Sequence, residues 1–273
     1  MIERKYLLTF SASMIVVSLI FGMLSYFRIP YQFYLWEIFF EGKILISVMI
    51  IFFFYKKKWI RFGRDQFSML SFNLRKNIAL FFLPLLLYSF SIAIGLTTKD
   101  VSLNKPENAA TLILATLFDI PAIYVFSVTT VFIEELIFRG MILQSFRNSH
   151  SIIRAMLFSS LLWTIFVLNE IVGIDDANLL SIVVVTFFFF SIGFFASALF
   201  LRNRSIIPGY SLRIGLITLT PIALSSRIVE ADAFFQTSSL FFYSEGIITS
   251  VLLIGISYVL VKQLGHVTAM TQF

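Results

Sequence analysis

Two adjacent glutamates and an arginine lie within a stretch of the sequence, residues 121–143, that is otherwise apolar. Glu135 and Arg139 are four residues apart, so on a helix they lie on one face in the favourable acid-first order for an ion pair. Glu134 lies about 100° around the helix axis from Glu135, so the pair need not engage it. The spacing therefore indicates one paired glutamate and a second glutamate that is left for another role.

Charged groups at membrane depth are costly, and they persist where they face a protein interior or a water-filled cavity and find partners. Arg139 alone is explained by a long side chain that reaches toward lipid headgroups. Two adjacent glutamates are not explained in that way. We therefore expect Glu134 and Glu135 to lie inside the protein, in a functional or packing role.

The composition of the whole chain predicts an all-α, polytopic membrane protein. Its 273 residues are 59% hydrophobic and have a mean hydropathy of +0.92, which is too apolar for a soluble domain. We expect about eight transmembrane helices in one bundle that forms a single domain, residues 1–273. The predicted spans are 6–27, 34–55, 77–96, 121–147, 152–168, 179–201, 205–224 and 247–261, with a partial helix at 109–118.

The basic residues predict how the chain is oriented. Most of the 21 lysines and arginines fall on the side of the predicted bundle that carries both termini, which places both termini in the cytoplasm. Residues 56–76 mix basic and aromatic side chains and are typical of an interfacial segment held by anionic membrane lipids. The net charge of +6 is explained in this way and does not indicate a nucleic-acid partner. The absence of cysteine excludes thiol chemistry and thiolate metal sites.

Two further patterns concern helix packing and polarity within the spans. The second predicted span carries Glu37, Glu41 and Lys43 in its first half. We interpret them as the end of a helix in the headgroup zone, and the alternative is a polar wall that faces a cavity.

Gly193 and Ser197, four residues apart, have the spacing of small residues that allow close helix packing.

Three stretches of the sequence resemble motifs of one family. Residues 134–140, with the pattern EExxxRG, resemble the first motif of the CPBP family of CAAX-type prenyl endopeptidases and bacteriocin-processing or immunity proteins. Ser159-Ser160-Leu161-Leu162-Trp163 is similar to the family's SSxxF stretch, and residues 200–208 are similar to its proline-containing turn. The resemblance covers about residues 121–220. It implies an eight-helix intramembrane protease fold in a prokaryotic cytoplasmic (bacterial inner) membrane.

The resemblance also implies roles for the charged residues. The first glutamate, Glu134, would activate water as the general base, and Glu135 and Arg139 would support it. The family's first histidine falls at Val167 and its second at Arg213. The catalytic set by resemblance is therefore Glu134, Glu135, Arg139 and Arg213.

Other positions follow from the same resemblance. Trp163 and Val167 would line the substrate cavity, and the family's asparagine falls at Ile217. Glu170, three residues after Val167 and about one helical turn along, would also line the cavity and could contribute an acid. The sequence contains two histidines, His150 and His266, and both lie outside the spans. We therefore expect no zinc and no other cofactor.

Arg213 has two alternative roles. It could donate hydrogen bonds to an oxyanion, or it could neutralise Glu134 in a buried ion pair, and we favour the ion pair. Three hypotheses follow: an impaired intramembrane endopeptidase, an inactive scaffold or regulator that binds through the former substrate cavity, and an unrelated transporter. The expected partners are membrane lipids and a membrane protein or lipidated peptide.

Overall fold

A computed structural model describes residues 2–26, 33–60, 69–103, 120–172, 179–223, 235–237, 241 and 246–270 of the chain. Its helices are α1 (Arg4–Tyr26), α2 (Phe33–Lys56), α3 (Leu74–Thr98), α5 (Ile120–Glu135), α6 (Gln144–Arg147), α7 (Ile152–Val172), α8 (Leu179–Asn203), α9 (Ile207–Ala223) and α10 (Ile247–Met270). A π-helix, η2 (Leu136–Leu143), joins α5 to α6. Each of the eight predicted spans thus contains helical residues, while the predicted partial helix at 109–118 lies outside the described residues. The number of membrane crossings stays a prediction.

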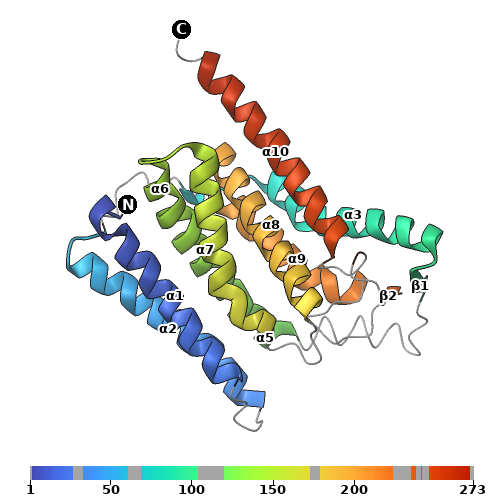
Figure 1. Ribbon diagram of the computed structural model, residues 1–273, viewed down its shortest axis with the longest axis horizontal. Coiled ribbons are helices and arrows are strands. Elements are labelled where there is room, and N and C mark those ends of the chain that lie inside the picture. Colours follow the sequence, from blue (N-terminus) through green and yellow to red (C-terminus); the bar gives the residue numbers. More distant parts are fainter. Residues whose placement is uncertain are drawn as a thin grey trace.

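The helices form a bundle in which neighbours pack side by side (Figure 1). α1 and α2 lie together at one edge, and α7 packs between α1 and α8. α8 also contacts α9 and α10, and α9 lies against α3. In Figure 1 the start of α1 and the end of α10 lie toward the same, upper side of the bundle.

Local sequence signals explain where several of these helices begin and end. Asn73 caps α3 by accepting a hydrogen bond from the Lys76 N–H at 3.2 Å. At the other end Lys99 adopts a left-handed conformation with φ 65°, as a helix terminus often requires. Arg204, with φ 50°, makes the tight turn from α8 to α9. Pro208 then occupies the first turn of α9, where its missing N–H costs nothing.

The fourth predicted helix differs from the prediction in its geometry. Residues 120–147 are continuously helical, but the eight residues of η2 have the wider π-helical winding. π-Helical turns are rare and concentrate at functional sites. Arg139 and Gly140 lie within η2, immediately after the two glutamates.

Glycines permit two close helix contacts. A Cβ atom at Gly193 of α8 would lie 2.9 Å from the Trp163 ring of α7, which confirms the predicted close packing at that position. A Cβ atom at Gly215 of α9 would lie 2.0 Å from the carbonyl oxygen of Phe81 in α3. These two contacts fix α8 against α7 and α9 against α3.

One small element departs from the all-α prediction. Strand β1 (Val101–Leu103) pairs antiparallel with β2 (Phe235–Thr237), and Ser102 lies opposite Gln236. Both strands fall in segments that the sequence indicates as connections between spans. The pairing depends on contacts between segments more than 130 residues apart, which a local pattern does not report.

The predicted interfacial segment, residues 56–76, is described in part, with residues 61–68 outside the described ranges. Lys56, Lys57 and Lys58 are exposed. Trp59 stacks on Tyr6 of α1 with ring centroids 4.2 Å apart. Two apolar side chains of the segment, Ile60 and Met69, are buried in the protein. The ends of the segment are therefore anchored on the bundle, and its lipid contact remains a prediction.

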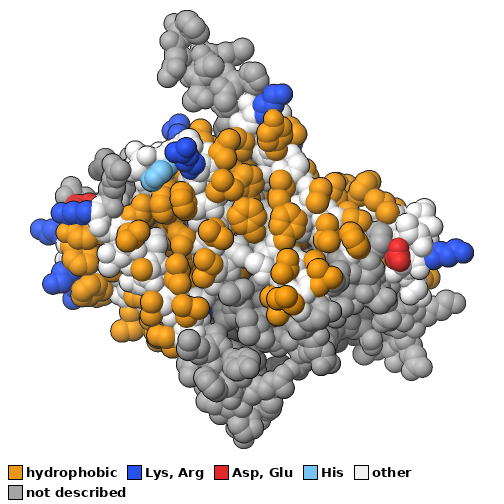
Figure 2. Space-filling view, viewed as in Figure 1, with side chains coloured by type: hydrophobic (Ala, Val, Ile, Leu, Met, Phe, Trp, Pro, Cys, Tyr) orange, Lys and Arg blue, Asp and Glu red, His pale blue; other side chains and the backbone are white. Residues whose placement is uncertain are grey.

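The surface of the bundle is strongly apolar. Figure 2 shows hydrophobic side chains across the middle of one face, with most of the Lys and Arg side chains near its edges. Among the described residues, α3 and α8 are long and apolar enough to cross a membrane, and shorter apolar stretches lie in α1, α7 and α10. Exposed large hydrophobic side chains include Leu8, Phe52, Leu86, Leu179 and Tyr258. A lipid environment would cover such a surface without the cost of exposing it to water.

Candidate functional site

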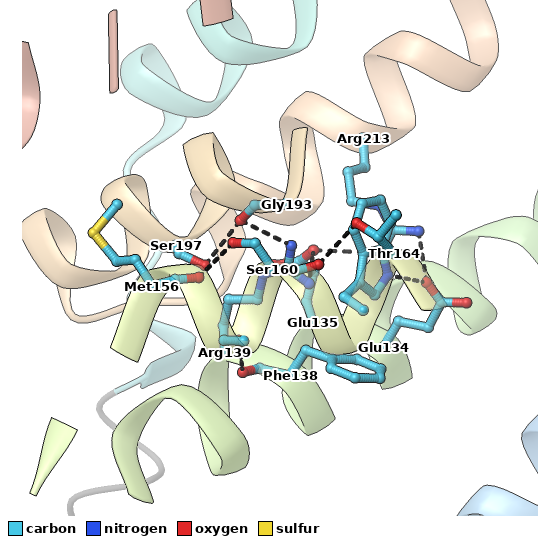
Figure 3. A network of polar contacts seen from close by, with 12 residues as sticks. Glu134, Glu135, Phe138, Arg139, Met156, Ser160, Thr164, Gly193, Ser197 and Arg213 are labelled. Carbon is cyan, nitrogen blue, oxygen red and sulfur yellow. Dashed lines mark hydrogen bonds and ion pairs between the residues drawn. The ribbon is translucent and has the colours of Figure 1, made fainter. Parts of the chain in front are cut away.

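The site centres on an arginine of α9 that bridges the two glutamates at the end of α5. Arg213 Nη2 lies 2.7 Å from Glu134 Oε2, and Arg213 Nη1 lies 3.3 Å from Glu135 Oε1. Both carboxylates are buried, and Arg213 is 8% exposed. Figure 3 shows the Arg213 side chain extending from its helix toward both acids. The charges therefore compensate one another inside the bundle, as buried charges require.

Trp163 of α7 contacts three of the charged side chains, Glu134, Arg139 and Arg213. Its indole Nε1–H donates a hydrogen bond of 2.8 Å to Glu134 Oε2, the same oxygen that receives Arg213. The guanidinium carbon of Arg213 lies 4.5 Å from the centroid of the Trp163 ring, and that of Arg139 lies 4.9 Å from it. Arginine over an indole face is an attractive cation–π arrangement. Trp163 is thus a hydrogen-bond donor to one acid and an aromatic surface for two cations.

Arg139 is fully buried within η2. Its Nη1 lies 3.5 Å from Glu135 Oε1, an electrostatic contact without hydrogen-bond geometry. Its Nη2 donates a 3.2 Å hydrogen bond to the carbonyl oxygen of Gly193 in α8. The interpretation that Arg139 reaches toward lipid headgroups is therefore wrong, because its partners hold it in the interior.

The structure corrects the interpretation of the two glutamates. Spacing along one helix indicated that Glu135 is paired and that Glu134 is left for another role. In the structure Glu134 is also paired, because Arg213 arrives from α9 and contacts both acids at once. A partner on another helix is invisible to a pattern within one helix. The alternative in which Arg213 neutralises Glu134 describes the observed contact.

Hydroxyl groups complete the polar network around the charges. Ser159 Oγ of α7 donates a 2.7 Å hydrogen bond to the carbonyl oxygen of Phe138 in η2. Ser197 Oγ donates to the Gly193 carbonyl at 2.8 Å, the oxygen that Arg139 also contacts. The side chains of Ser160 and Thr164 instead bond carbonyl oxygens one turn back on their own helix. Ser159 therefore links α7 to the π-helical segment.

The space beside Glu135 depends on a glycine at the start of α9. A Cβ atom at Gly209 would lie 2.7 Å from Glu135 Oε2, closer than real contacts allow. Gly209 is buried, one residue after Pro208 in the first turn of the helix. The proline-containing turn therefore brings α9 close enough for Arg213, one turn further along, to reach the acids.

The structure brings five of the predicted site residues together. Glu134, Glu135, Arg139, Trp163 and Arg213, from the fourth, fifth and seventh predicted spans, converge as expected. Their catalytic roles stay predictions.

Three other positions were predicted for the site: Val167, Glu170 and Ile217. Val167 is fully buried one turn after Trp163 on α7. Glu170 belongs to α7, but its side chain lies outside the described residues. Ile217, at the position of the family's asparagine, is 41% exposed.

One further charged side chain near this site is buried. Lys43 of α2 is 1% exposed, so its side chain lies inside the protein. Its Nζ lies 4.0 Å from the centroid of the Phe166 ring on α7. Its position within an apolar stretch was the available signal, by the same reasoning that identified Glu134 and Glu135. The side chains of Glu37 and Glu41 lie outside the described residues.

The residues of this site do not fit a zinc ion. Both acids that could serve as ligands are paired with guanidinium groups, and no histidine belongs to the site. Across the described ranges, no three His, Cys, Asp or Glu side chains gather at one point. Catalytic zinc sites use three such protein ligands. These residues therefore support no reaction step through bound zinc, and the lack of a cofactor stays a prediction.

Comparison with protein families gives a match over part of the chain. The family model "Type II CAAX prenyl endopeptidase Rce1-like" matches residues 115–216. No curated protein and no solved structure matches the chain. The matched segment contains Glu134, Glu135, Arg139, Trp163 and Arg213, the five residues that the structure brings together. Over this segment the chain is similar to the CAAX-type prenyl endopeptidases of the CPBP family, a membrane protein family.

Proposed function

We propose that this chain is a CPBP-family membrane protein whose peptidase centre is closed, and that it binds a membrane protein or lipidated peptide through the former substrate cavity. The observation that carries the proposal is the 2.7 Å ion pair between Arg213 Nη2 and Glu134 Oε2. Peptide hydrolysis is then lost or strongly reduced, and the protein acts as a scaffold or regulator of its partner.

The chemical reason lies in what a general base must do. Glu134 would have to accept a proton from water within hydrogen-bond reach of its carboxylate. Glu134 Oε2 already accepts hydrogen bonds from Trp163 and Arg213. Arg213 is also bound to Glu135, so moving it would break two ion pairs rather than one. Loss of one oxyanion donor alone costs about 100- to 1000-fold in rate, and the family's two histidines are replaced here by Val167 and Arg213.

An active endopeptidase is the second candidate function, and it gives the Arg213–Glu134 contact a catalytic role. An active endopeptidase would use Glu134 to activate water, and Arg213 would stabilise the oxyanion formed at the scissile carbonyl. The position of the Arg213 guanidinium directly beside Glu134 favours this alternative, because an oxyanion donor must lie near the attacking water. The family match is compatible with both functions, and it contradicts the hypothesis of an unrelated transporter.

The proposal includes a placement in the membrane. Eight helices cross the bilayer, both termini face the cytoplasm, and the membrane is the cytoplasmic membrane of a bacterium. The exposed apolar side chains and the one-sided distribution of the basic residues support this arrangement.

Two measurements test the proposed function. Wild type and Glu134→Gln are purified with their partners from native membranes, and both are assayed in lipid nanodiscs with a fluorogenic prenylated peptide. We expect no cleavage above background and the same partner on both proteins. Glu3→Gln, an acid-to-amide change at the N-terminus away from the site, is the matched control. Cleavage by wild type alone, or uncut protein accumulating on Glu134→Gln, would establish the peptidase instead.

A further inference from the structure

Lysines and aromatic rings gather where α1 begins and α2 ends. Lys5 Nζ lies 4.8 Å from the centroid of the Tyr6 ring, and the Tyr6 ring stacks on Trp59 with centroids 4.2 Å apart. Trp59 meets Phe53 edge to face at 6.0 Å, and Lys57 Nζ lies 5.9 Å from the Phe53 centroid. These contacts form one continuous lysine–aromatic row, in which three rings are flanked by an ammonium group at each end.

Backbone contacts hold the middle of this row in place. Lys58 adopts a left-handed conformation with φ 59°, and the Trp59 N–H then donates to the Phe54 carbonyl oxygen at 2.9 Å. The Trp59 carbonyl oxygen accepts a 3.0 Å hydrogen bond from the Glu3 N–H, immediately before α1. The indole is therefore tied to both helices, and a site that is already ordered loses less entropy when a ligand binds.

An exposed apolar stripe runs along α2 from the same lysines. Lys56 Nζ lies 4.9 Å from the centroid of Phe52, and Met49 and Leu45 lie one and two turns further along the helix. The spacing of these positions places them on one helix face, and all three apolar side chains are more than half exposed. From Lys56 to Leu45 the helix rises about 17 Å, and the hydrocarbon of one leaflet is roughly 15 Å deep. The stripe therefore matches an acyl chain in length.

The charge at this end of the helix pair is strongly positive. Lys5, Lys56, Lys57 and Lys58 are all exposed. Glu3 lies 3.5 Å from Lys5 Nζ, but the Lys5 side chain is 67% exposed, and an ion pair in such a position contributes little. The ammonium groups can therefore receive the phosphate of a lipid headgroup. Each lysine near an anionic membrane surface strengthens binding about fivefold.

We propose that the lysine–aromatic row and the α2 stripe bind one anionic phospholipid. Its phosphate lies among Lys5, Lys56 and Lys57, and an acyl chain lies along Phe52 and Met49. A phosphatidylcholine headgroup binds less well, because its own cation is repelled by the lysines. The site lies outside residues 115–216, which the family model matches, and it does not depend on the state of Glu134. It therefore goes beyond the proposed function.

A lipid fits this surface better than an acidic protein segment does. The predicted span 34–55 places the stripe within the hydrocarbon, and Lys56 and Lys57 follow directly after that span. A phospholipid satisfies both parts at once, with the phosphate at the boundary and the chain below it. An acidic peptide in water would satisfy the lysines and leave the stripe uncovered.

Native mass spectrometry of the purified full-length protein tests the site. Wild type in detergent is titrated with phosphatidylglycerol or with phosphatidylcholine of the same chains, and the affinity for the first bound lipid is measured. We expect wild type to prefer phosphatidylglycerol. Lys5→Gln and Lys57→Gln should each weaken its binding about fivefold and leave phosphatidylcholine binding unchanged. Equal binding of the two lipids by wild type would overturn the proposal and leave the lysines to an acidic protein partner.

Matched variants separate a built site from general positive charge. Lys262→Gln removes an exposed lysine of another helix, α10, and should leave phosphatidylglycerol binding within about twofold of wild type. A loss as large as that of Lys57→Gln would show nonspecific attraction and refute the site. Lys57→Arg keeps the charge and should retain most of the affinity. Lys5 distinguishes the row from the run of three lysines, because it lies on α1: an unchanged affinity in Lys5→Gln would refute the row.

The apolar stripe has its own variant. Met49→Gln should weaken the binding of both lipids by the same factor and leave the preference for phosphatidylglycerol unchanged, because Met49 contacts the chain and not the headgroup. No effect on either lipid would refute the stripe. The substituted side chains are exposed, so each variant should keep the wild-type Tm, which is measured alongside. Peptide cleavage by wild type would refute the closed centre and leave the lipid site intact, whereas equal lipid binding without cleavage would refute the lipid site alone.

Discussion

Arg213 on α9 and Glu134 at the end of α5 form an ion pair of 2.7 Å between side chains that are 79 residues apart in the sequence. The same guanidinium contacts Glu135 at 3.3 Å and lies over the Trp163 ring. The pair joins two helices that contact each other in the bundle. The ion pair therefore holds α9 against α5. It also neutralises the charge of Glu134, the acid that a peptidase would use as its base.

The three charged residues of the EExxxR pattern should differ in their effect on stability. Glu135→Ala removes the acid that contacts both Arg139 and Arg213, and Arg139→Ala removes a fully buried cation. Each should destabilise the fold by about 3–5 kcal/mol, because a buried charge loses its partner. Glu134→Gln should leave the fold intact with a smaller loss, since a glutamine oxygen can still accept from Trp163 and Arg213. Thermal unfolding in detergent measures the relative stability of the three variants. Equal Tm values for all three would contradict the prediction.

Arg213→Lys should lose one of the two acid contacts. A guanidinium presents several donors in a fixed fork and reaches Glu134 and Glu135 together, whereas an ammonium is a single point charge. We expect Tm to lie between those of wild type and Arg213→Met. A lysine variant as stable as wild type would show that the fork geometry is unimportant for the fold.

Gly215→Ala should separate α9 from α3. The added methyl group would lie 2.0 Å from the Phe81 carbonyl oxygen, so the backbone must move, at a cost of about 1–3 kcal/mol or more. Gly255→Ala on α10 is the matched control, because nothing lies within 4 Å of the new Cβ atom. That control should gain roughly 0.5–1 kcal/mol from higher helix propensity. A measurement of Tm checks both, and a stable Gly215→Ala variant would contradict the close approach.

The helices and the convergence of the acidic motif could be predicted because their signals are local. Long apolar stretches define the helices, and a charge within such a stretch must turn inward whatever the rest of the fold does. Glu134, Glu135 and Arg139 were found in this way, and the family motifs added Trp163 and Arg213. Lys43 lies near the start of its span, where a charge is equally typical of a helix end in the headgroup zone, so its burial could not be predicted from the sequence alone.

The sequence by itself determined that this chain is helical, that it is too apolar for water, and that acids and bases had to be gathered inside it. Tertiary structure alone decided how they pair: Arg213 takes both glutamates, Arg139 bonds to a carbonyl of α8, and the helix that carries the acids winds into a π-helix. The physical reason is that the apolar residues around a charged side chain in the sequence already indicate that the charge must face the protein interior. Pairing depends on distances of about 3 Å between helices, which are set only when the helices pack.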